Sequence, residues 1–468
     1  MNIKRITFLT CFSAMLLASI NIFGNLEEKF FNKFEENSQT PFGNLQESDI
    51  RALQNLIIEK YEENEVVSEN RDLTPKDLTP AENVKDKIDE STSIGSTPDN
   101  IASYQKQRPA NLTFNYKYDK NSPKDMDEFV FVKSETNIRK APGVSSGILK
   151  KAAYSEKYKV LGKVADIENG TSEWYEIEVN GGKGYVISTN MIKRKFDWED
   201  MLKRVSRTNR FITDSLSQNK KIYVLDSYVP LGGGSGGNKD KFGNRENQSE
   251  RGYLNSSLTG NFINIPDRSI MTITEETDKY VKVKIDIYDN VEYYLRKSGK
   301  KILKDSGISG EITRFIYVDR ESQNEIVIEK NSGSESWNVV TSSFVTTGKD
   351  ASDSYATPYG VFLIAHSTRV IQYTGSDNKT VVGDAKYAVR FSGGGYMHGI
   401  PSVFEPKNTR EQRKAATARK IGTYPESHKC IRHYDDQIKF IYDWLGNSTP
   451  GDKNGFRVPE VTTMMIVK

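Results

Sequence analysis

Short runs in which hydrophobic and polar residues alternate succeed one another along most of the chain after residue 126. Such period-two runs predict β-strands, so we expect a mainly β protein. In the first region, residues 126–196, turn-forming residues such as Gly181-Gly182 separate the runs and predict a small barrel. The runs expected to form its strands are 129–133, 137–139, 157–164, 174–179 and 184–186.

A second region, residues 220–302, repeats the last part of this pattern. Residues 280–285 alternate as 174–179 do, and 293–295 correspond to 184–186. We therefore interpret 220–302 as a possible second, diverged copy of the barrel. Its glycine-rich stretch, 232–237, lacks the following helix and the spaced lysine of a phosphate-binding loop, so a flexible loop is expected.

The third region, residues 314–468, combines strands with short helices. Strands are expected at 315–318, 325–329, 339–347, 360–365, 389–391 and 461–467. One helix is expected after residue 434, because Asp435 and Asp436 suit its first turn and Gly446 suits its end. Its apolar face is expected to consist of Ile438, Ile441, Tyr442 and Leu445.

The N-terminal quarter has a different character. Residues 1–24 are typical of a signal peptide, with Lys4 and Arg5 before an apolar run, so we expect export to the periplasm or to the cell wall or surface. Residues 25–125 are expected to form a charged tether, disordered over 64–125. No later stretch reaches the roughly 18 apolar residues that span a bilayer, so no stable membrane insertion is expected after signal cleavage.

The charge balance limits the partners. The chain has 66 basic and 63 acidic residues, a net charge of +3, and no concentrated basic region of the kind that binds nucleic acid. We therefore expect no nucleic-acid partner, and the sequence carries no signal for an oligomeric state.

Candidate chemistry centres on Cys430. The only other cysteine, Cys11, lies in the predicted signal peptide, so the exported chain cannot form an internal disulfide. A reactive thiol needs a base within reach and donors for an oxyanion. Candidate bases are His398, which is flanked by glycines, and the neighbouring His428 and His433. His366 is expected to be a surface residue.

Three ordered motifs make residues 314–468 resemble the catalytic domain of the L,D-transpeptidases. They are Thr357-Pro358-Tyr359-Gly360-Val361-Phe362, the pair His398-Gly399, and Ser427-His428-Lys429-Cys430-Ile431-Arg432. The resemblance implies a β-sandwich-like fold with short helices. It implies that Cys430 is the nucleophile and His398 its base, that the Gly399 carbonyl orients the imidazole, and that no metal or organic cofactor is needed.

Further residues receive roles from the same resemblance. His428 would be a catalytic residue that shapes the site and helps to stabilise the oxyanion, and the backbone amides of Lys429 and Cys430 would complete the oxyanion hole. Ser427 would shape the site. Arg432 would hold the loop or bind a substrate carboxylate. Tyr396, two residues before His398, is expected to shape the site or contact substrate.

The first region resembles bacterial Src-homology-3 (SH3)-like domains of wall proteins. The resemblance rests on Asn137-Ile138-Arg139, Trp174-Tyr175 and Gly184-Tyr185-Val186. It implies a targeting or spacing module. The expected fold is thus one or two small SH3-like barrels followed by the catalytic domain.

Two departures from the family pattern stand out. Lys429 replaces a glycine, so it would be strained if the backbone there has positive φ, and its ammonium could lower the pKa of Cys430. The stretch 400–426 is longer than usual and rich in Lys and Arg. It is interpreted as a solvated helix or, alternatively, as a basic lid over an acidic peptide.

The implied reaction joins peptidoglycan stem peptides. Cys430 would attack the third residue of a tetrapeptide donor, release D-alanine, and pass the acyl group to the diamino-acid side chain of an acceptor stem as a 3→3 cross-link. Water as acceptor would make the protein a carboxypeptidase, and a protein amine would make it an anchoring enzyme. Another cysteine peptidase, a non-catalytic wall-binding protein, and a zinc site of His398, His428, Cys430 and His433 remain open alternatives.

Overall fold

The computed structural model describes residues 100–468 except 105–107, 124–126, 169, 229–238, 246–248, 287–290, 352–353, 375–378 and 450–454. The described residues all belong to one compact unit, Ile94–Lys468. The predicted signal peptide, the tether before residue 100 and the glycine-rich stretch 232–237 lie outside them.

The first sheet holds the strands predicted in region 126–196, with two additions. They are β3 (Glu128–Val132), β4 (Thr136–Arg139), β5 (Ile148–Ala152), β6 (Lys157–Ala165), β7 (Glu173–Val179), β8 (Gly182–Ile187) and β9 (Met191–Lys195), with a 3-10 turn, η1 (Ser188–Asn190), before β9. The pairing order is β5-β4-β8-β7-β6-β3-β9, so the described sheet is not closed. The sequence analysis did not predict β5 or β9.

Part of the predicted tether is ordered, and the expectation of disorder up to residue 125 is wrong there. Strand β1 (Asn100–Ser103) pairs with β6, and β2 (Leu112–Thr113) pairs with β19 (Trp337–Phe344) of the third region. Phe114 then packs edge-on against Trp198, with ring centroids 5.3 Å apart. Leu112 and Phe114 are flanked by many polar residues, yet this segment is ordered. Its strands add to the edges of sheets that are already formed, which supply the missing backbone partners.

The second sheet repeats the topology of the first. Its strands are β10 (Tyr223–Leu225), β11 (Ser249–Tyr253), β12 (Phe262–Pro266), β13 (Ile270–Glu276), β14 (Tyr280–Ile285), β15 (Glu292–Arg296) and β16 (Leu303–Asp305), with η2 (Lys297–Ile302) before β16. Their order, β12-β11-β15-β14-β13-β10-β16, matches the first sheet strand for strand in chain sequence, including the 3-10 turn before the last strand. This repetition supports our proposal that residues 220–302 form a second, diverged SH3-like domain, which we call the second domain.

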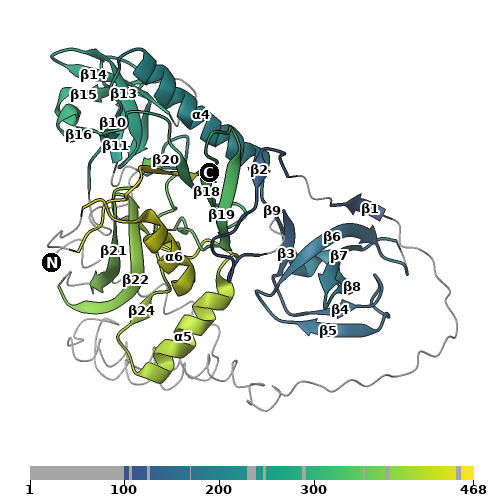
Figure 1. Cartoon of the computed structure of the whole chain (residues 1–468). Helices are drawn as coiled ribbons and strands as arrows, with labels where there is room; N and C mark the ends of the chain where they lie inside the picture. Colours follow the sequence, from purple (N-terminus) through teal and green to yellow (C-terminus); the bar gives the residue numbers. More distant parts are fainter. Residues whose placement is uncertain are drawn as a thin grey trace, which may run out of the picture. The chain divides into compact units, whose positions relative to one another are not determined.

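The third region is a two-sheet sandwich. One sheet has the order β2-β19-β18-β17-β26-β20, and the other has β21-β22-β23-β25 with β24 paired to β22. The new strands are β17 (Arg314–Asp319), β18 (Asn324–Lys330), β20 (Gly360–Leu363), β21 (His366–Thr374), β22 (Val381–Ser392), β23 (Gly395–His398), β24 (Ser402–Val403), β25 (Ile431–Arg432) and β26 (Thr463–Val467). Helix α6 (Asp435–Leu445) lies beside β22, as Figure 1 shows, and its bounds and apolar face are those predicted.

Strands of the first sandwich sheet are buried on both faces. Ile316 and Val318 of β17 join the core between the two sheets, whereas Phe315 and Tyr317 face the opposite way into a second core. That second core is completed by helix α4 (Trp198–Ser217), which includes Val205 among its buried residues and which the sequence analysis did not predict.

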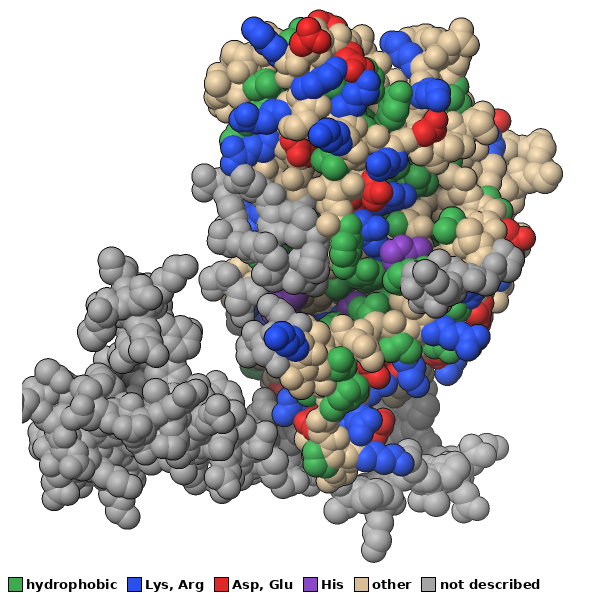
Figure 2. Space-filling model, turned by 90° about the vertical axis from the view of Figure 1, so that its left-hand side faces the viewer, with side chains coloured by type: hydrophobic (Ala, Val, Ile, Leu, Met, Phe, Trp, Pro, Cys, Tyr) green, Lys and Arg blue, Asp and Glu red, His purple; other side chains and the backbone are tan. Residues whose placement is uncertain are grey.

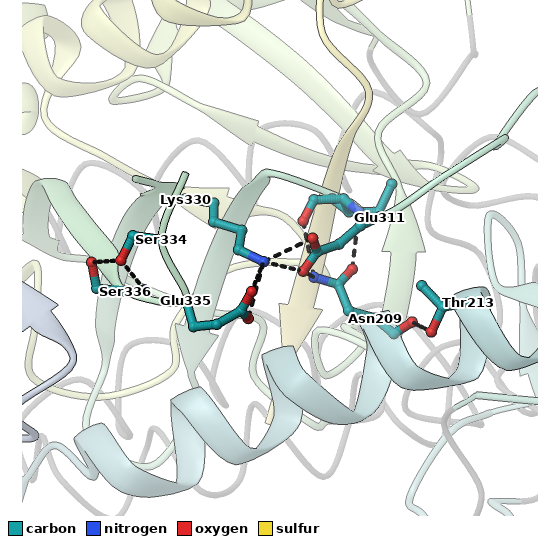
Figure 3. Close-up of polar contacts among 8 residues, drawn as sticks. Asn209, Thr213, Glu311, Lys330, Ser334, Glu335 and Ser336 are labelled. Carbon is teal, nitrogen blue, oxygen red and sulfur yellow. Dashed lines mark hydrogen bonds and ion pairs between the residues drawn. The ribbon is translucent and has the colours of Figure 1, made fainter. Parts of the chain in front are cut away.

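Helix α4 is also tied to the start of β17 by polar contacts. Asn209 donates from Nδ2 to the carbonyl of Ile312 at 3.0 Å and accepts from its N–H at 3.0 Å. Figure 3 shows the adjoining contacts, in which Glu311 contacts both Asn209 and Lys330. The helix therefore supports the back of the sandwich, opposite the sheet that carries Cys430.

Candidate active site

The candidate site lies on one face of the β21-β22-β23-β25 sheet. Strand β23 pairs antiparallel with β22 and parallel with β25, so that Met397 lies opposite Ile431 and His398 opposite Arg432. Met397 and Ile431 point into the core between the sheets. Because side chains alternate along a strand, His398 and Arg432 point to the other face, and Cys430, directly before β25, continues it.

Cys430 is almost fully buried at 4% exposure. Its Sγ lies 3.7 Å from the carbonyl oxygen of Gly394, to which the thiol donates. Burial raises the pKa of the thiol, while the Tyr396 N–H and the charges of Lys429 and Arg432 oppose that rise. The resting group is therefore a thiol, and it needs a base to become a nucleophile.

His398 has the orientation and the neutral charge state that such a base requires. Its Nδ1 lies 2.6 Å from the carbonyl of Gly399, so Nδ1 carries the hydrogen and Nε2 keeps its lone pair in the neutral ring. Burial lowers its pKa to about 4, against the opposing effect of the Gly399 hydrogen bond. The imidazole is thus neutral at pH 7. His398 and Cys430 are diagonal neighbours on adjacent strands, a relation in which residues typically lie about 7–8 Å apart and their Cβ atoms somewhat closer.

Ser427 and His428 take different positions in the loop before Cys430. Ser427 is buried, and its carbonyl accepts from the N–H of Lys349 at 2.7 Å. His428 is exposed. The loop therefore anchors Ser427 through its backbone and leaves the His428 ring at the surface beside the site.

The backbone at Lys429, where the family has a glycine, does have a positive φ. Its φ is 73°, a left-handed conformation that costs a non-glycine residue roughly 1 kcal/mol. Its backbone is fully engaged, because its N–H donates to Tyr355 O at 2.7 Å and its carbonyl accepts from Thr357 Oγ1 at 2.8 Å. The prediction that the Lys429 amide contributes to an oxyanion hole is therefore wrong for this conformation.

The Lys429 side chain is buried next to the thiol. Its Nζ donates to the carbonyl of Gly393 at 2.6 Å, one residue from the carbonyl that Cys430 contacts. Burial lowers the pKa of the amine to about 7, with Asp267 and Cys430 opposing this shift. Its positive charge favours the Cys430 thiolate as predicted, but burial of the thiol outweighs it.

Replacing Lys429 with methionine is expected to shift the reactivity of Cys430 to higher pH. Methionine keeps the length of the side chain and makes the same backbone demand but removes the charge, which in the wild type is present below about pH 7 and fades above it. At pH 6 we expect alkylation by iodoacetamide to slow about tenfold. The measurement is the alkylation rate between pH 5 and 10, with exposed Lys407→Met as the matched control. Superimposable profiles for Lys429→Met and wild type would contradict the prediction.

Tyr373 is a site residue that the sequence analysis missed. Its hydroxyl lies 3.5 Å from Nδ1 and 3.4 Å from Nε2 of His398, and burial followed by the charge of Cys430 raises its pKa. It lies in β21, a strand that was not predicted because its hydrophobic residues are few. Only the hairpin of β21 and β22 brings it to His398.

The two remaining histidines have other partners. His366, expected at the surface, is half-buried and packs against Phe456, with ring centroids 4.4 Å apart. His433 is fully buried and lies 2.8 Å from Glu325 Oε2 through Nε2. Because His433 bonds away from Cys430, it does not fit the zinc alternative. Among the described residues, no group of three or more His, Cys, Asp or Glu side chains could hold a metal ion.

The basic stretch 400–426 contains helix α5 (Lys407–Lys420), which buries none of its residues. Lys414 pairs with Asp435 at 2.7 Å, and Asp435 accepts from the N–H of Ile400 at 2.8 Å, next to Gly399. The helix is solvated, as one of the two interpretations held, and a lid function remains a prediction.

Figure 2 shows histidine and hydrophobic side chains together in a hollow of one face, with many Lys and Arg side chains around it.

Comparison with known proteins identifies two domains. Residues 313–458 match the family model of the L,D-transpeptidase catalytic domain, and residues 134–192 match that of the bacterial SH3 domain. The prediction of a mainly β protein with these two kinds of domain is confirmed. No curated protein matches the chain.

Several solved structures are similar to the chain. An L,D-transpeptidase from Mycobacterium smegmatis is 14% identical, covers 43% of this chain and 93% of its own, and has a TM-score of 0.24. An L,D-transpeptidase from Mycobacterium tuberculosis H37Rv is 13% identical over 41% of this chain and 67% of its own, with a TM-score of 0.22. A fused Zn-dependent amidase/peptidase/peptidoglycan-binding protein from Clostridium acetobutylicum is 21% identical over 33% of this chain, with a TM-score of 0.21, and the match spans only 52% of that protein.

Proposed function

We propose, from the L,D-transpeptidase catalytic domain at residues 313–458, that this protein cross-links peptidoglycan stem peptides through Cys430. The observation that carries the proposal is the pairing of a buried thiol with a neutral, oriented imidazole on the neighbouring strand. This pairing supplies a nucleophile and a base without a metal.

The first half of the proposed reaction forms an acyl-enzyme. Nε2 of His398 takes the thiol proton as Sγ of Cys430 attacks the carbonyl carbon at the L centre of the third stem residue. The tetrahedral intermediate collapses by breaking the bond to D-alanine, whose amine leaves with the proton from His398. A thioester on Cys430 remains. The developing imidazolium is stabilised by the Gly399 carbonyl, which accepts from Nδ1 at 2.6 Å.

The second half transfers the acyl group. The side-chain amine of the third residue of a neighbouring stem attacks the thioester, His398 takes its proton, and Cys430 leaves as thiolate and is reprotonated. The product is a 3→3 cross-link. Burial of the site supports transfer to an amine over hydrolysis, because it limits the access of water to the thioester.

We further propose that the protein is exported and acts in the periplasm or at the cell wall, where the bacterial SH3 domain would hold it near its substrate. Among the described helices, none is both long and apolar enough to cross a membrane.

The test is mass spectrometry of the products formed from purified disaccharide-tetrapeptide, with Cys430→Ala as control. A cross-linked dimer that lacks one D-alanine, absent with the variant, is the expected result. Tripeptide monomer alone would replace the transpeptidase with an L,D-carboxypeptidase. No D-alanine release from this donor, with or without an added protein acceptor, would overturn the proposed function.

A further inference from the structure

The second domain reaches the face of the sheet that carries Cys430. Arg390 of β22 lies opposite Tyr396 of β23 in the antiparallel pair, and the parallel register of β23 with β25 then places Tyr396 beside Cys430. Directly opposed residues share a face, so Arg390, Tyr396 and Cys430 form a row across three strands. Two strand spacings separate Arg390 from Cys430, or roughly 10 Å between Cα atoms.

Arg390 is held in this row by residues of the second domain. Its Nη2 lies 2.6 Å from Oδ2 of Asp267, and the two side chains are only 9% and 0% exposed. The other oxygen of Asp267 accepts from the N–H of Ser227 at 2.6 Å, which fixes the adjacent Tyr228. The guanidinium carbon of Arg390 then lies 4.6 Å from the centre of the Tyr228 ring. One carboxylate therefore positions both the cation and the aromatic ring that covers it.

The guanidinium keeps unused hydrogen-bonding capacity. Within the described part of the chain, Nε of Arg390 has no hydrogen-bond partner although it is buried. Tyr228, by contrast, is half exposed, so this pair lies where the buried row meets solvent. A planar guanidinium with an unpaired N–H is suited to a carboxylate, which can accept a charge-assisted hydrogen bond from it.

We propose that Arg390, positioned by Asp267 and Tyr228 of the second domain, binds the C-terminal carboxylate of the donor stem, the group carried by the departing D-alanine. This proposal rests on the proposed function. The departing residue carries its carboxylate directly after the bond that Cys430 attacks, and an arginine side chain spans most of the distance from Arg390 to that position. The second domain is then part of the donor site and not only a spacer, and it makes the enzyme selective for donors with a free C-terminus.

The decisive experiment compares two alkylating agents that differ in charge. Iodoacetate carries a carboxylate next to the carbon that Sγ attacks, and iodoacetamide is its neutral counterpart. Arg390→Gln is expected to lower the ratio of the iodoacetate rate to the iodoacetamide rate about tenfold, with the iodoacetamide rate nearly unchanged. Arg390→Lys should keep part of the preference because it keeps the charge. An unchanged ratio, or an equal fall in both rates, would overturn the proposal.

A matched control is available in Arg457, whose guanidinium carbon lies 4.1 Å from the centre of the Tyr442 ring. Arg457→Gln removes a similar arginine–tyrosine contact and should leave the ratio unchanged. If Arg390→Gln fails to fold, Tyr228→Ala provides a second test of the proposal. It removes a half-exposed side chain and should lower the ratio severalfold, and no change would count against the proposal.

Turnover with two donors separates this proposal from the proposed function. Wild type should prefer a tetrapeptide donor with a free C-terminus over its C-terminal amide, and Arg390→Gln should raise KM about tenfold for the acid only. A donor whose third residue is a diamino acid with a second carboxylate, amidated at that side-chain carboxylate instead, should behave like the acid. If wild type instead turned over that donor as poorly as the C-terminal amide, Arg390 would bind the side-chain carboxylate, and the proposal would be refuted. If wild type turns over no donor, the proposed function fails, while the alkylation ratio still decides whether Arg390 is an anion site next to Cys430.

Discussion

Cys430→Ala is expected to lower kcat/KM for D-alanine release by about 10⁵-fold or more, to the level of the reaction without a nucleophile. Covalent catalysis divides one difficult acyl transfer into two easier steps, and alanine leaves no atom to form the thioester. Binding of the stem peptide should survive, because the thiol is a small part of the surface that the substrate meets. The measurement is D-alanine release in the linear range, together with equilibrium binding of the tetrapeptide.

Cys430→Ser provides the stricter comparison, because it retains an attacking atom in nearly the same place. A serine hydroxyl is far harder to ionise than a thiol, and His398 has a pKa of about 4, so it is too weak a base to compensate. The serine variant should therefore lie within about tenfold of the alanine variant. Both should unfold within about 1 kcal/mol of wild type, since the thiol is small and the hydrogen bond that it donates to Gly394 is long, at 3.7 Å. Substantial activity in the alanine variant would show that Cys430 is not the nucleophile, and substantial activity in the serine variant alone would show that His398 is a stronger base than its pKa implies.

Much of the fold could be predicted because its strands follow simple patterns. The runs at 315–318, 325–329 and 461–467 became β17, β18 and β26 within two residues at either end. Long hydrophobic, β-branched runs suit strands that are buried on both faces, and these are covered by the other sheet and by α4.

Helix α4 shows what that approach overlooks. Its N-terminal Asp197 accepts from the N–H of Asp200, and Glu199 and Asp200 lie in its first turn, so its capping signals were present in the sequence. It fell between two regions that had been assigned as β domains, and its polar face is wide. The position of the helix is set by tertiary packing: the outer face of the sandwich sheet is hydrophobic, and α4 buries it.

Some residues of the candidate site could be predicted from the sequence and others could not. Cys430 and His398 could be predicted because local motifs carry them. Tyr373, Arg390 and Asp267 could not, since strand pairing and a contact between domains bring them near Cys430. The resemblance also suggested an amide donor at Lys429, and the actual backbone uses that amide to hold the loop to Tyr355.

His398→Gln is expected to lower kcat/KM by about 10²–10⁴-fold, the usual contribution of a general base. Glutamine retains a similar shape and can still contact Gly399, so the loss reports proton transfer more than geometry. In wild type this base should remain unprotonated from pH 7 down to about pH 5, because its pKa is about 4. Loss of stem-peptide binding with an unchanged rate on bound substrate would contradict this role.

The same histidine should leave a signature in the pH dependence of stability, independent of any substrate. Its pKa is about 4 in the folded protein, against about 6.5 in the unfolded chain. Between these values the unfolded state binds a proton that the folded state does not, so stability is complete above about pH 6.5 and falls as pH drops toward 4. The full effect is of order 3 kcal/mol. Subtracting the unfolding free energy of His398→Gln from that of wild type cancels the other titrating groups and isolates this loss. A difference that stays constant from pH 7 to pH 4 would mean that His398 is not held neutral, and the proposed proton transfer from Cys430 would lose its acceptor.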